Sequence, residues 1–228
     1  MTKMKDCGIK ARAAGNKFLL EDNIRHWQLL RYGDLEELWE AMGSDDSDER
    51  IPYWTELWPA SLALGEWLKS KAEDIKNKIC LELGCGLGFT AIIGQQLGAE
   101  MLASDYELAA LEYCRRNAAG NMAPLLCIAM DWRAPALAQG SLERLWGADV
   151  IYEKRFIDPV LDLADYILAE KGLAWFAEPG RAIFDLFRQK AAARGYNMAD
   201  VFSCQVSDPH APSRKIHSTV WELSRQKS

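Results

Sequence analysis

Short apolar runs alternate with amphipathic stretches over much of the chain, from about residue 79 to residue 194. Short apolar runs are typical of buried strands, and apolar positions three or four residues apart are typical of helices. Strand, helix, strand, helix at this spacing predicts a mostly parallel sheet covered by helices on both faces. The predicted strands are 79–83, 101–104, 125–130, 148–152 and 172–177, and the predicted helices are 89–97, 108–117, 156–168 and 183–194.

Two further apolar runs, 201–206 and 219–223, end the pattern and are separated by the turn-rich segment 207–213. Two strands joined in this way are expected to pair as an antiparallel hairpin. The predicted fold class is therefore α/β, a Rossmann-like doubly wound sheet of seven strands that is mostly parallel and ends in a C-terminal antiparallel hairpin.

The first 50 residues have a different pattern. Asp34 and Glu37 are spaced as a capping box, and the apolar positions that follow predict a helix that ends at Gly43. The acidic run 44–49 is most simply a solvated loop. Residues 1–50 are predicted to be an N-terminal helical extension, and residues 51–228 the main domain, which opens with an aromatic segment and a helix near Pro59.

The composition excludes several classes of protein. With 228 residues, 49% hydrophobic and 26% charged, the chain is expected to form a soluble, cytoplasmic globular protein. It has no apolar run near the roughly 20 residues of a membrane span, and no apolar core follows its N-terminus as in a secretory signal. A net charge of −6 argues against nucleic acid as the main partner. The six cysteines form no Cys-x-x-Cys pair, so neither a metal site nor a disulfide framework is predicted.

A glycine-rich turn follows the first strand of the alternating pattern. It runs from Glu82 through Gly84, Gly86 and Gly88 into an apolar helix. Glycines let the backbone turn tightly and approach a ligand closely. In nicotinamide enzymes the third glycine comes one residue later, and the turn seats a pyrophosphate. An acidic Glu82 would repel a pyrophosphate but suit the ammonium of a methionine moiety. The position of Glu82 and the glycine spacing therefore favour S-adenosylmethionine over NAD.

Two more acidic residues end the next two predicted strands. Asp105 lies 23 residues beyond Glu82, where a carboxylate can accept hydrogen bonds from both ribose hydroxyls. The simpler alternative for Asp105 is a helix cap. Asp131 can accept from the adenine amino group while neighbouring apolar atoms, such as those of Trp132, cover the ring. Asp131 as a turn residue is the competing interpretation.

These features together resemble a known family. The turn 82–88, Asp105, the pair Asp131-Trp132 and the segment 149–152 resemble the seven-strand, S-adenosylmethionine-dependent protein methyltransferases grouped as methyltransferase family 16. That family includes lysine methyltransferases that act on chaperones and on the electron-transfer flavoprotein β subunit.

Two other segments are similar to this family. The Trp-Pro segment 53–60 resembles one that these enzymes carry before the cofactor turn. Segment 177–181 resembles the Asp-Pro-Gly-Arg of the flavoprotein branch, with Glu178 in place of Asp. The resemblance covers about residues 50–223, and it implies methyl transfer to the nitrogen of a lysine in a protein substrate.

The chemistry of methyl transfer to nitrogen suggests roles for the residues around the acceptor. Asp149 and Tyr152 are the expected catalytic residues, with Asp149 holding the incoming ammonium. Trp54 and Glu153 are expected to contact the substrate, and Trp58 the cofactor. Aromatic walls can orient a cationic amine by cation–π contact, and an apolar pocket lowers the high pKa of a lysine. In the simpler alternative Tyr152 is a strand residue and Trp54 a core anchor.

Other functions are compatible with some of these sequence features. The same cofactor could serve N-methylation of a small amine or heterocycle, or the chain could be a non-catalytic adenosyl-binding protein of the same fold. A nicotinamide oxidoreductase is disfavoured by the glycine spacing.

Overall fold

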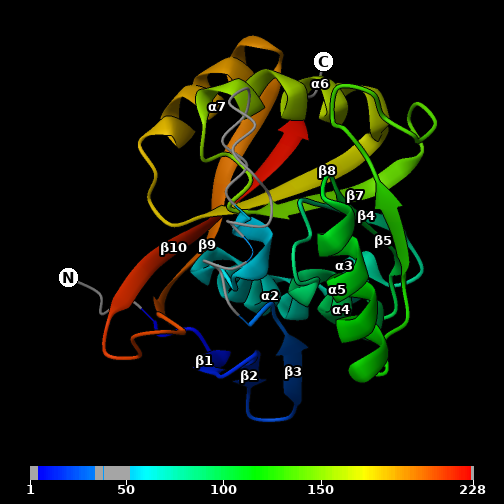
Figure 1. Ribbon diagram of the computed structural model, residues 1–228. Helices are drawn as coiled ribbons and strands as arrows, with labels where there is room; N and C mark the ends of the chain where they lie inside the picture. Colours follow the sequence, from blue (N-terminus) through cyan, green and yellow to red (C-terminus); the bar gives the residue numbers. More distant parts are fainter. Residues whose placement is uncertain (1–4, 34–37, 39–51, 227–228) are drawn as a thin grey trace.

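The computed structural model describes residues 5–33, 38 and 52–226. Its main element is a seven-stranded sheet in the order β6-β5-β4-β7-β8-β10-β9 (Figure 1). The first five strands in this order are parallel, and β10 is antiparallel to both β8 and β9. The strands are β4 (Ile79–Leu83), β5 (Glu100–Asp105), β6 (Leu126–Ala129), β7 (Leu142–Ala148), β8 (Leu168–Glu178), β9 (Tyr196–Ser207) and β10 (Lys215–Arg225). The predicted fold class is confirmed.

Helices cover both faces of the sheet. In Figure 1, α6 and α7 lie on one side of the sheet and α2, α4 and α5 on the other, and each layer has its own hydrophobic cluster. The helices are α2 (Pro59–Ser70), α3 (Ala72–Ile75), α4 (Phe89–Gln96), α5 (Leu108–Gly120), α6 (Ile157–Ile167) and α7 (Ile183–Ala193), with short 3-10 helices η1 (Tyr53–Thr55) and η2 (Lys154–Phe156). The four predicted helices of the alternating region are confirmed to within a few residues.

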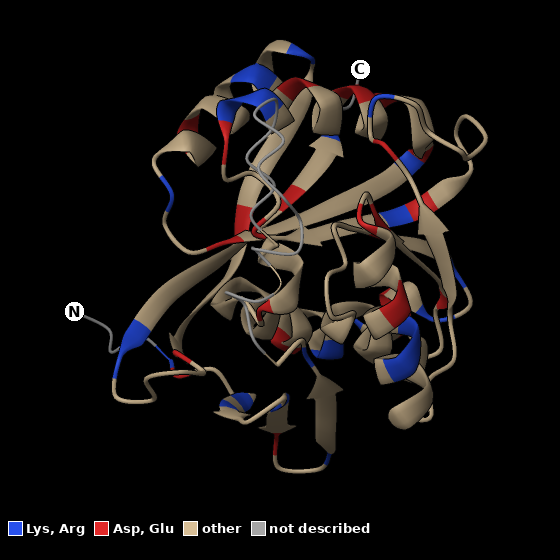
Figure 2. Cartoon of the chain, in the orientation of Figure 1, with Lys and Arg blue, Asp and Glu red and all other residues tan. Residues whose placement is uncertain are grey.

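Ion pairs join the two outer helices. Figure 2 shows acidic residues along α6 and basic residues along α7. Lys190 of α7 reaches Asp158 of α6, with an N–O distance of 2.6 Å, and Arg194, the C-cap residue of α7, reaches Asp162 at 2.5 Å. These pairs are partly exposed, so they align the two helices more than they stabilise the fold.

The position predicted for the fourth parallel strand is wrong. That strand was expected over 148–152, whereas β7 ends at Ala148. The charged residues Glu143 and Arg144 interrupt its apolar pattern, although Arg144 is itself buried with its guanidinium 5.9 Å from the ring centre of Trp175. At Asp149 the backbone takes a φ of 57°, which is incompatible with a strand, so residues 149–152 form a loop at the end of the sheet.

The N-terminal segment is also different from its prediction. Residues 10–30, expected to belong to a helical extension, form a three-stranded antiparallel sheet of β1 (Lys10–Ala14), β2 (Lys17–Glu21) and β3 (His26–Leu30), which we call the N-terminal sheet. Its buried side chains alternate along the strands, a period-2 pattern typical of half-buried strands. The buried side chains are Ala11, Phe18, Leu20, Trp27 and Leu29, and they join the hydrophobic cluster of α2, α4 and α5. The predicted helix over 35–42 lies almost wholly outside the described residues.

No helix in the described part of the chain combines the length and the apolar character needed to cross a membrane.

Candidate active site

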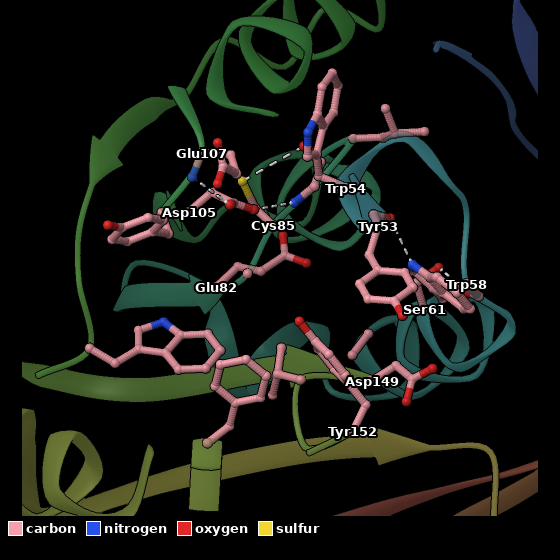
Figure 3. Close-up of a pocket in the computed structure, with 18 of the residues that line it drawn as sticks. Tyr53, Trp54, Trp58, Ser61, Glu82, Cys85, Asp105, Glu107, Asp149 and Tyr152 are labelled. Atoms are coloured by element: carbon pink, nitrogen blue, oxygen red, sulfur yellow. Dashed lines mark hydrogen bonds between the residues drawn. The ribbon is translucent and has the colours of Figure 1, made fainter. Parts of the chain in front are cut away.

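A cavity of about 350 Å³ opens at the carboxyl ends of β4, β5 and β7. In a doubly wound sheet this edge is where ligands bind, at the point where the chain leaves β4 for one side and later returns to the other. The size falls in the range of small-molecule sites, roughly 300–1,000 Å³. Three segments enclose the cavity: the glycine-rich turn after β4, the Trp-Pro segment around η1, and the loop after β7 (Figure 3).

The glycine-rich turn has backbone angles and close contacts that residues with a Cβ could not accommodate. Gly84, Gly86 and Gly88 have φ values of 57°, 49° and 83°. A Cβ on Gly88 would lie 2.5 Å from the Sγ of Cys114, and a Cβ on Gly86 would lie 3.2 Å from the carbonyl oxygen of Trp54. The left-handed backbone and the close packing together require glycine at these positions.

Glu82 places a buried carboxylate on the cavity wall. The hydroxyl of Thr90 donates a hydrogen bond to its Oε1, while Oε2 is buried without a partner. Burial raises the pKa of Glu82 to about 8 because the ionised form loses its hydration. An unpartnered buried acceptor is costly, and a cationic ligand group in the cavity would satisfy it.

Asp105 ends β5 and lies in the same cavity (Figure 3). Its Oδ2 accepts a hydrogen bond from the N–H of Gly86 at 2.9 Å, and its Oδ1 accepts from the N–H of Glu107 at 3.0 Å. Burial raises the pKa of Asp105, and these backbone hydrogen bonds oppose that shift. The side chain is thereby held rigidly against the glycine turn, with lone pairs left for ligand hydroxyls.

Asp131 and Trp132 lie at the edge of the cavity. Both carboxylate oxygens of Asp131 accept hydrogen bonds from the guanidinium of Arg133, which lowers the pKa of Asp131. The ring of Trp132 lies edge-on to Phe156, with 5.6 Å between their centroids. The structure thus brings the three predicted acids around one cavity, with Asp131 partly exposed and already paired.

Aromatic side chains form the other wall. The ring of Tyr53 lies between Trp58 and Tyr152, at centroid distances of 5.8 and 5.3 Å, and Phe156 lies 4.9 Å from Tyr152. The Trp58 indole also donates to the carbonyl of Tyr53 at 3.0 Å. Burial raises the pKa of Tyr152 to about 12, so its phenol is neutral at physiological pH. We call Tyr53, Trp58, Tyr152 and Phe156 the aromatic wall.

Two members of the aromatic wall were not singled out from the sequence. Tyr53 lies in the Trp-Pro segment, where its aromatic neighbours are a usable signal. In the sequence, Phe156 is an ordinary apolar residue at the start of the helix predicted over 156–168. The sequence contains no signal for its position in the cavity. Trp54, predicted to contact substrate, is largely buried and packs on Tyr113 at 5.4 Å, although it also lines the cavity.

Asp149 has a strong partner within the protein. Arg181 binds both of its carboxylate oxygens, at 2.5 and 2.7 Å, and the Asp149 side chain is 3% exposed. This bidentate pairing raises the pKa of Arg181. Glu153, the other acid of this loop, pairs with Arg155 at 2.8 Å. Asp149 therefore faces the cavity as part of an ion pair rather than as a free carboxylate.

No group of three or more His, Cys, Asp or Glu side chains in the described residues is arranged to hold a metal ion.

Solved structures identify the fold of this chain. A ribosomal protein L11 methylase from Lactobacillus delbrueckii subsp. bulgaricus matches with a TM-score of 0.54 and 17% identity, covering 71% of this chain and 78% of that one. Magnesium protoporphyrin IX methyltransferase from Synechocystis PCC 6803, solved with bound S-adenosylmethionine, matches with a TM-score of 0.57 and 16% identity, covering 78% of this chain and 82% of that one. The fold of this chain is therefore the Rossmann-like fold of S-adenosylmethionine-dependent methyltransferases.

The family follows from the sequence comparison. A model of the lysine methyltransferase family matches residues 47–178, and the chain belongs to this family. It is 24% identical over 159 residues to the protein N-lysine methyltransferase METTL21A of Xenopus tropicalis, covering 68% of this chain and 74% of that protein. It is 29% identical over 181 residues to the electron transfer flavoprotein beta subunit lysine methyltransferase of Xenopus laevis, covering 75% of this chain and 69% of that protein.

The residues that line the cavity fit S-adenosylmethionine as the cofactor. Glu82 offers an unpartnered buried acceptor for an ammonium group, and Asp105 offers a rigid carboxylate for ribose hydroxyls. When bound, S-adenosylmethionine supplies an electrophilic methyl group on a sulfonium.

Proposed function

We propose that this enzyme methylates the side-chain nitrogen of a lysine residue in a protein substrate. The observation that carries the proposal is the aromatic wall, which lies beside the cofactor acids in one cavity. Family membership supports it, as do the two relatives, whose names describe lysine methyltransferases.

The aromatic wall has two tasks in this proposal. A lysine has a pKa near 10.4 and is charged in water, whereas the attacking nitrogen must be neutral. Tyr53, Trp58 and Tyr152 attract the ammonium to the cavity mouth by cation–π contact. Their apolar surfaces then desolvate the ammonium, which lowers its pKa. The proton is released to solvent before the nitrogen attacks.

Tyr152 and Asp149 are the proposed catalytic and positioning residues. The neutral phenol oxygen of Tyr152 can accept a hydrogen bond from the amine and point its lone pair along the line of displacement. Asp149, held by Arg181, fixes the loop that carries Tyr152. This role differs from the expected one of holding the substrate ammonium, because both carboxylate oxygens already have a partner. Glu153 and Trp54, which both line the cavity, remain proposed substrate contacts.

The test uses radiolabelled S-adenosylmethionine with a lysate of the organism of origin. We expect a labelled protein band whose hydrolysate contains methylated lysine. Gly86→Val is the control without cofactor binding, because a larger residue would meet Trp54 and strain the turn. Tyr152→Phe should bind S-adenosylhomocysteine normally yet transfer about 100-fold more slowly, within the range for a lost positioning contact.

Each other outcome would contradict the proposal in a distinct way. Label confined to small molecules would indicate methylation of a small amine or heterocycle. Label on arginine would indicate the activity named for another relative, the histone-arginine methyltransferase METTL23 of Xenopus laevis, which is 25% identical over 158 residues. Cofactor binding with no transfer to any acceptor would indicate a non-catalytic adenosyl-binding protein.

A further inference from the structure

One edge of strand β3 bonds to side chains of helix α5 instead of to another strand. The N–H of Leu30 donates to the Oδ1 of Asn117 at 2.7 Å, and the carbonyl of Leu30 accepts from the Nδ2 of Asn117 at 3.1 Å. A carboxamide presents the same donor and acceptor as a peptide group. Asn117, which is 1% exposed, therefore takes the place of a neighbouring strand.

The same carboxamide reaches the glycine-rich turn. Asn117 Nδ2 also donates to the carbonyl of Leu87, at 3.0 Å. Leu87 lies between Gly86 and Gly88, at the part of the turn that lines the cavity. The two N–H groups of one buried amide thus hold the N-terminal sheet and the cofactor turn together.

A second asparagine one helical turn later provides a natural comparison. Asn121 Oδ1 accepts from the N–H of Gln28 at 3.1 Å, and its Nδ2 donates to the carbonyl of Gln28 at 2.7 Å. The remaining hydrogen bond of its side chain goes from Nδ2 to the carbonyl of Asn117 within α5, at 2.8 Å. Asn121 therefore binds β3 in the same way as Asn117, but its hydrogen bonds go to β3 and α5 rather than to the turn.

We propose that Asn117 is a positioning residue for the cofactor turn, through which the N-terminal sheet increases the affinity for S-adenosylmethionine without contacting it. None of residues 10–30 lines the cavity, and they precede the segment 47–178 that the family model matches. The turn contains three glycines, so its backbone is intrinsically free, and a fixed Leu87 carbonyl reduces that freedom. By linkage, a ligand that orders the turn must strengthen the contact with β3 equally.

The first test compares Asn117→Ala with Asn121→Ala. Both variants lose a contact with β3, and we expect both to lower the free energy of unfolding measured in urea. Only Asn117→Ala should weaken S-adenosylhomocysteine binding in calorimetry, by about tenfold, which corresponds to one lost hydrogen bond of about 1.4 kcal/mol. Asn121→Ala should stay within about twofold of the wild type, because its partners do not include the turn. Equal weakening in both variants, or unchanged affinity in Asn117→Ala, would overturn the proposal.

The second test needs no variant and so does not depend on how Asn117→Ala folds. Hydrogen exchange of the wild-type protein is followed by NMR with and without S-adenosylhomocysteine. The ligand should slow exchange at the N–H of Leu30 more than at the N–H of Gln28. Both amides bond to an asparagine side chain, Asn117 within α5 and Asn121 at its C-cap. Equal changes at the two amides, or none at Leu30, would show that the sheet is not coupled to the turn through Asn117.

Discussion

At the scale of single residues, the site depends on carboxylates that differ in their partners. Glu82 and Asp105 are buried and face the cavity, and burial raises the pKa of each. Asp131 and Asp149 are neutralised by the arginines Arg133 and Arg181. The first two are therefore the acids with capacity left for a ligand, and the predictions at this scale concern them.

Asp105→Ala should weaken binding of S-adenosylhomocysteine by about 100-fold, because hydrogen bonds to a charged group contribute about 1.5–3 kcal/mol each. Calorimetry measures the affinity, and circular dichroism checks that the variant is folded. The loss of the Gly86 N–H partner adds to the effect by loosening the turn. Unchanged affinity would remove Asp105 from the cofactor site.

Glu82 should make the ligand-free protein less stable as the pH rises. Its pKa is about 8 in the folded protein and near 4.5 when unfolded, so the folded state binds the proton more tightly. The stability is fully present below pH 4.5 and falls as the pH rises toward 8, with a limiting slope of about 1.4 kcal/mol per pH unit. Glu82→Gln removes this contribution. The difference in unfolding free energy between variant and wild type, measured in urea from pH 5 to 9, should grow with pH, and parallel profiles would contradict the assignment.

At the scale of elements, the N-terminal sheet packs as part of the main core. Trp27 is 2% exposed, and its indole N–H donates to the Oε1 of Gln96 at the end of α4, at 2.9 Å. Just beyond β3, Arg31 pairs with Glu56 of the Trp-Pro segment at 2.9 Å. The sheet therefore touches both elements that flank the cavity, the helix after the glycine turn and the segment that carries Trp58.

Trp27→Ala should lower the free energy of unfolding by about 3–5 kcal/mol, the usual cost of truncating a buried large aromatic residue. Ile24→Ala, in the turn between β2 and β3, is the matched control, because Ile24 is 84% exposed and should have little effect. Urea unfolding followed by circular dichroism gives both values. Similar small losses in the two variants would mean that the N-terminal sheet is only loosely attached.

At the scale of the whole molecule, the sheet, its helices and the N-terminal sheet should unfold as one cooperative unit. Tryptophans are buried both in the N-terminal sheet, at Trp27, and in the main sheet, at Trp146 and Trp175. We expect fluorescence and far-ultraviolet circular dichroism to report the same urea transition. Separate transitions would show that the two parts fold independently.

The ligand should stabilise the same unit. S-adenosylhomocysteine at 100 times its Kd should raise the free energy of unfolding by about 2.7 kcal/mol, by mass action alone. The effect is measured as the shift in the urea unfolding midpoint between protein with and without S-adenosylhomocysteine. Asp105→Ala at the same ligand concentration should show a much smaller shift, and an equal shift would indicate binding elsewhere.

The sequence alone predicted the alternating elements, the seven-strand sheet and the three acids that line the cavity. It could do so because short apolar runs, helical periodicity, glycines and strand-end carboxylates are local signals. It misplaced β7, since Glu143 and Arg144 hide an otherwise apolar strand, and it missed the strands of residues 10–30.

The tertiary structure alone decided the contacts between distant residues. Arg181 neutralises Asp149 across 32 positions, and Asn117 joins Leu30, 87 positions away, to the glycine turn. Neither pairing has a local signature, because an ion pair or an amide contact depends on which side chains the folded sheet and helices bring within 3 Å of each other. The sequence specifies the chemical groups of this methyltransferase. Packing decides which of these groups are already paired within the protein and which can bind a ligand.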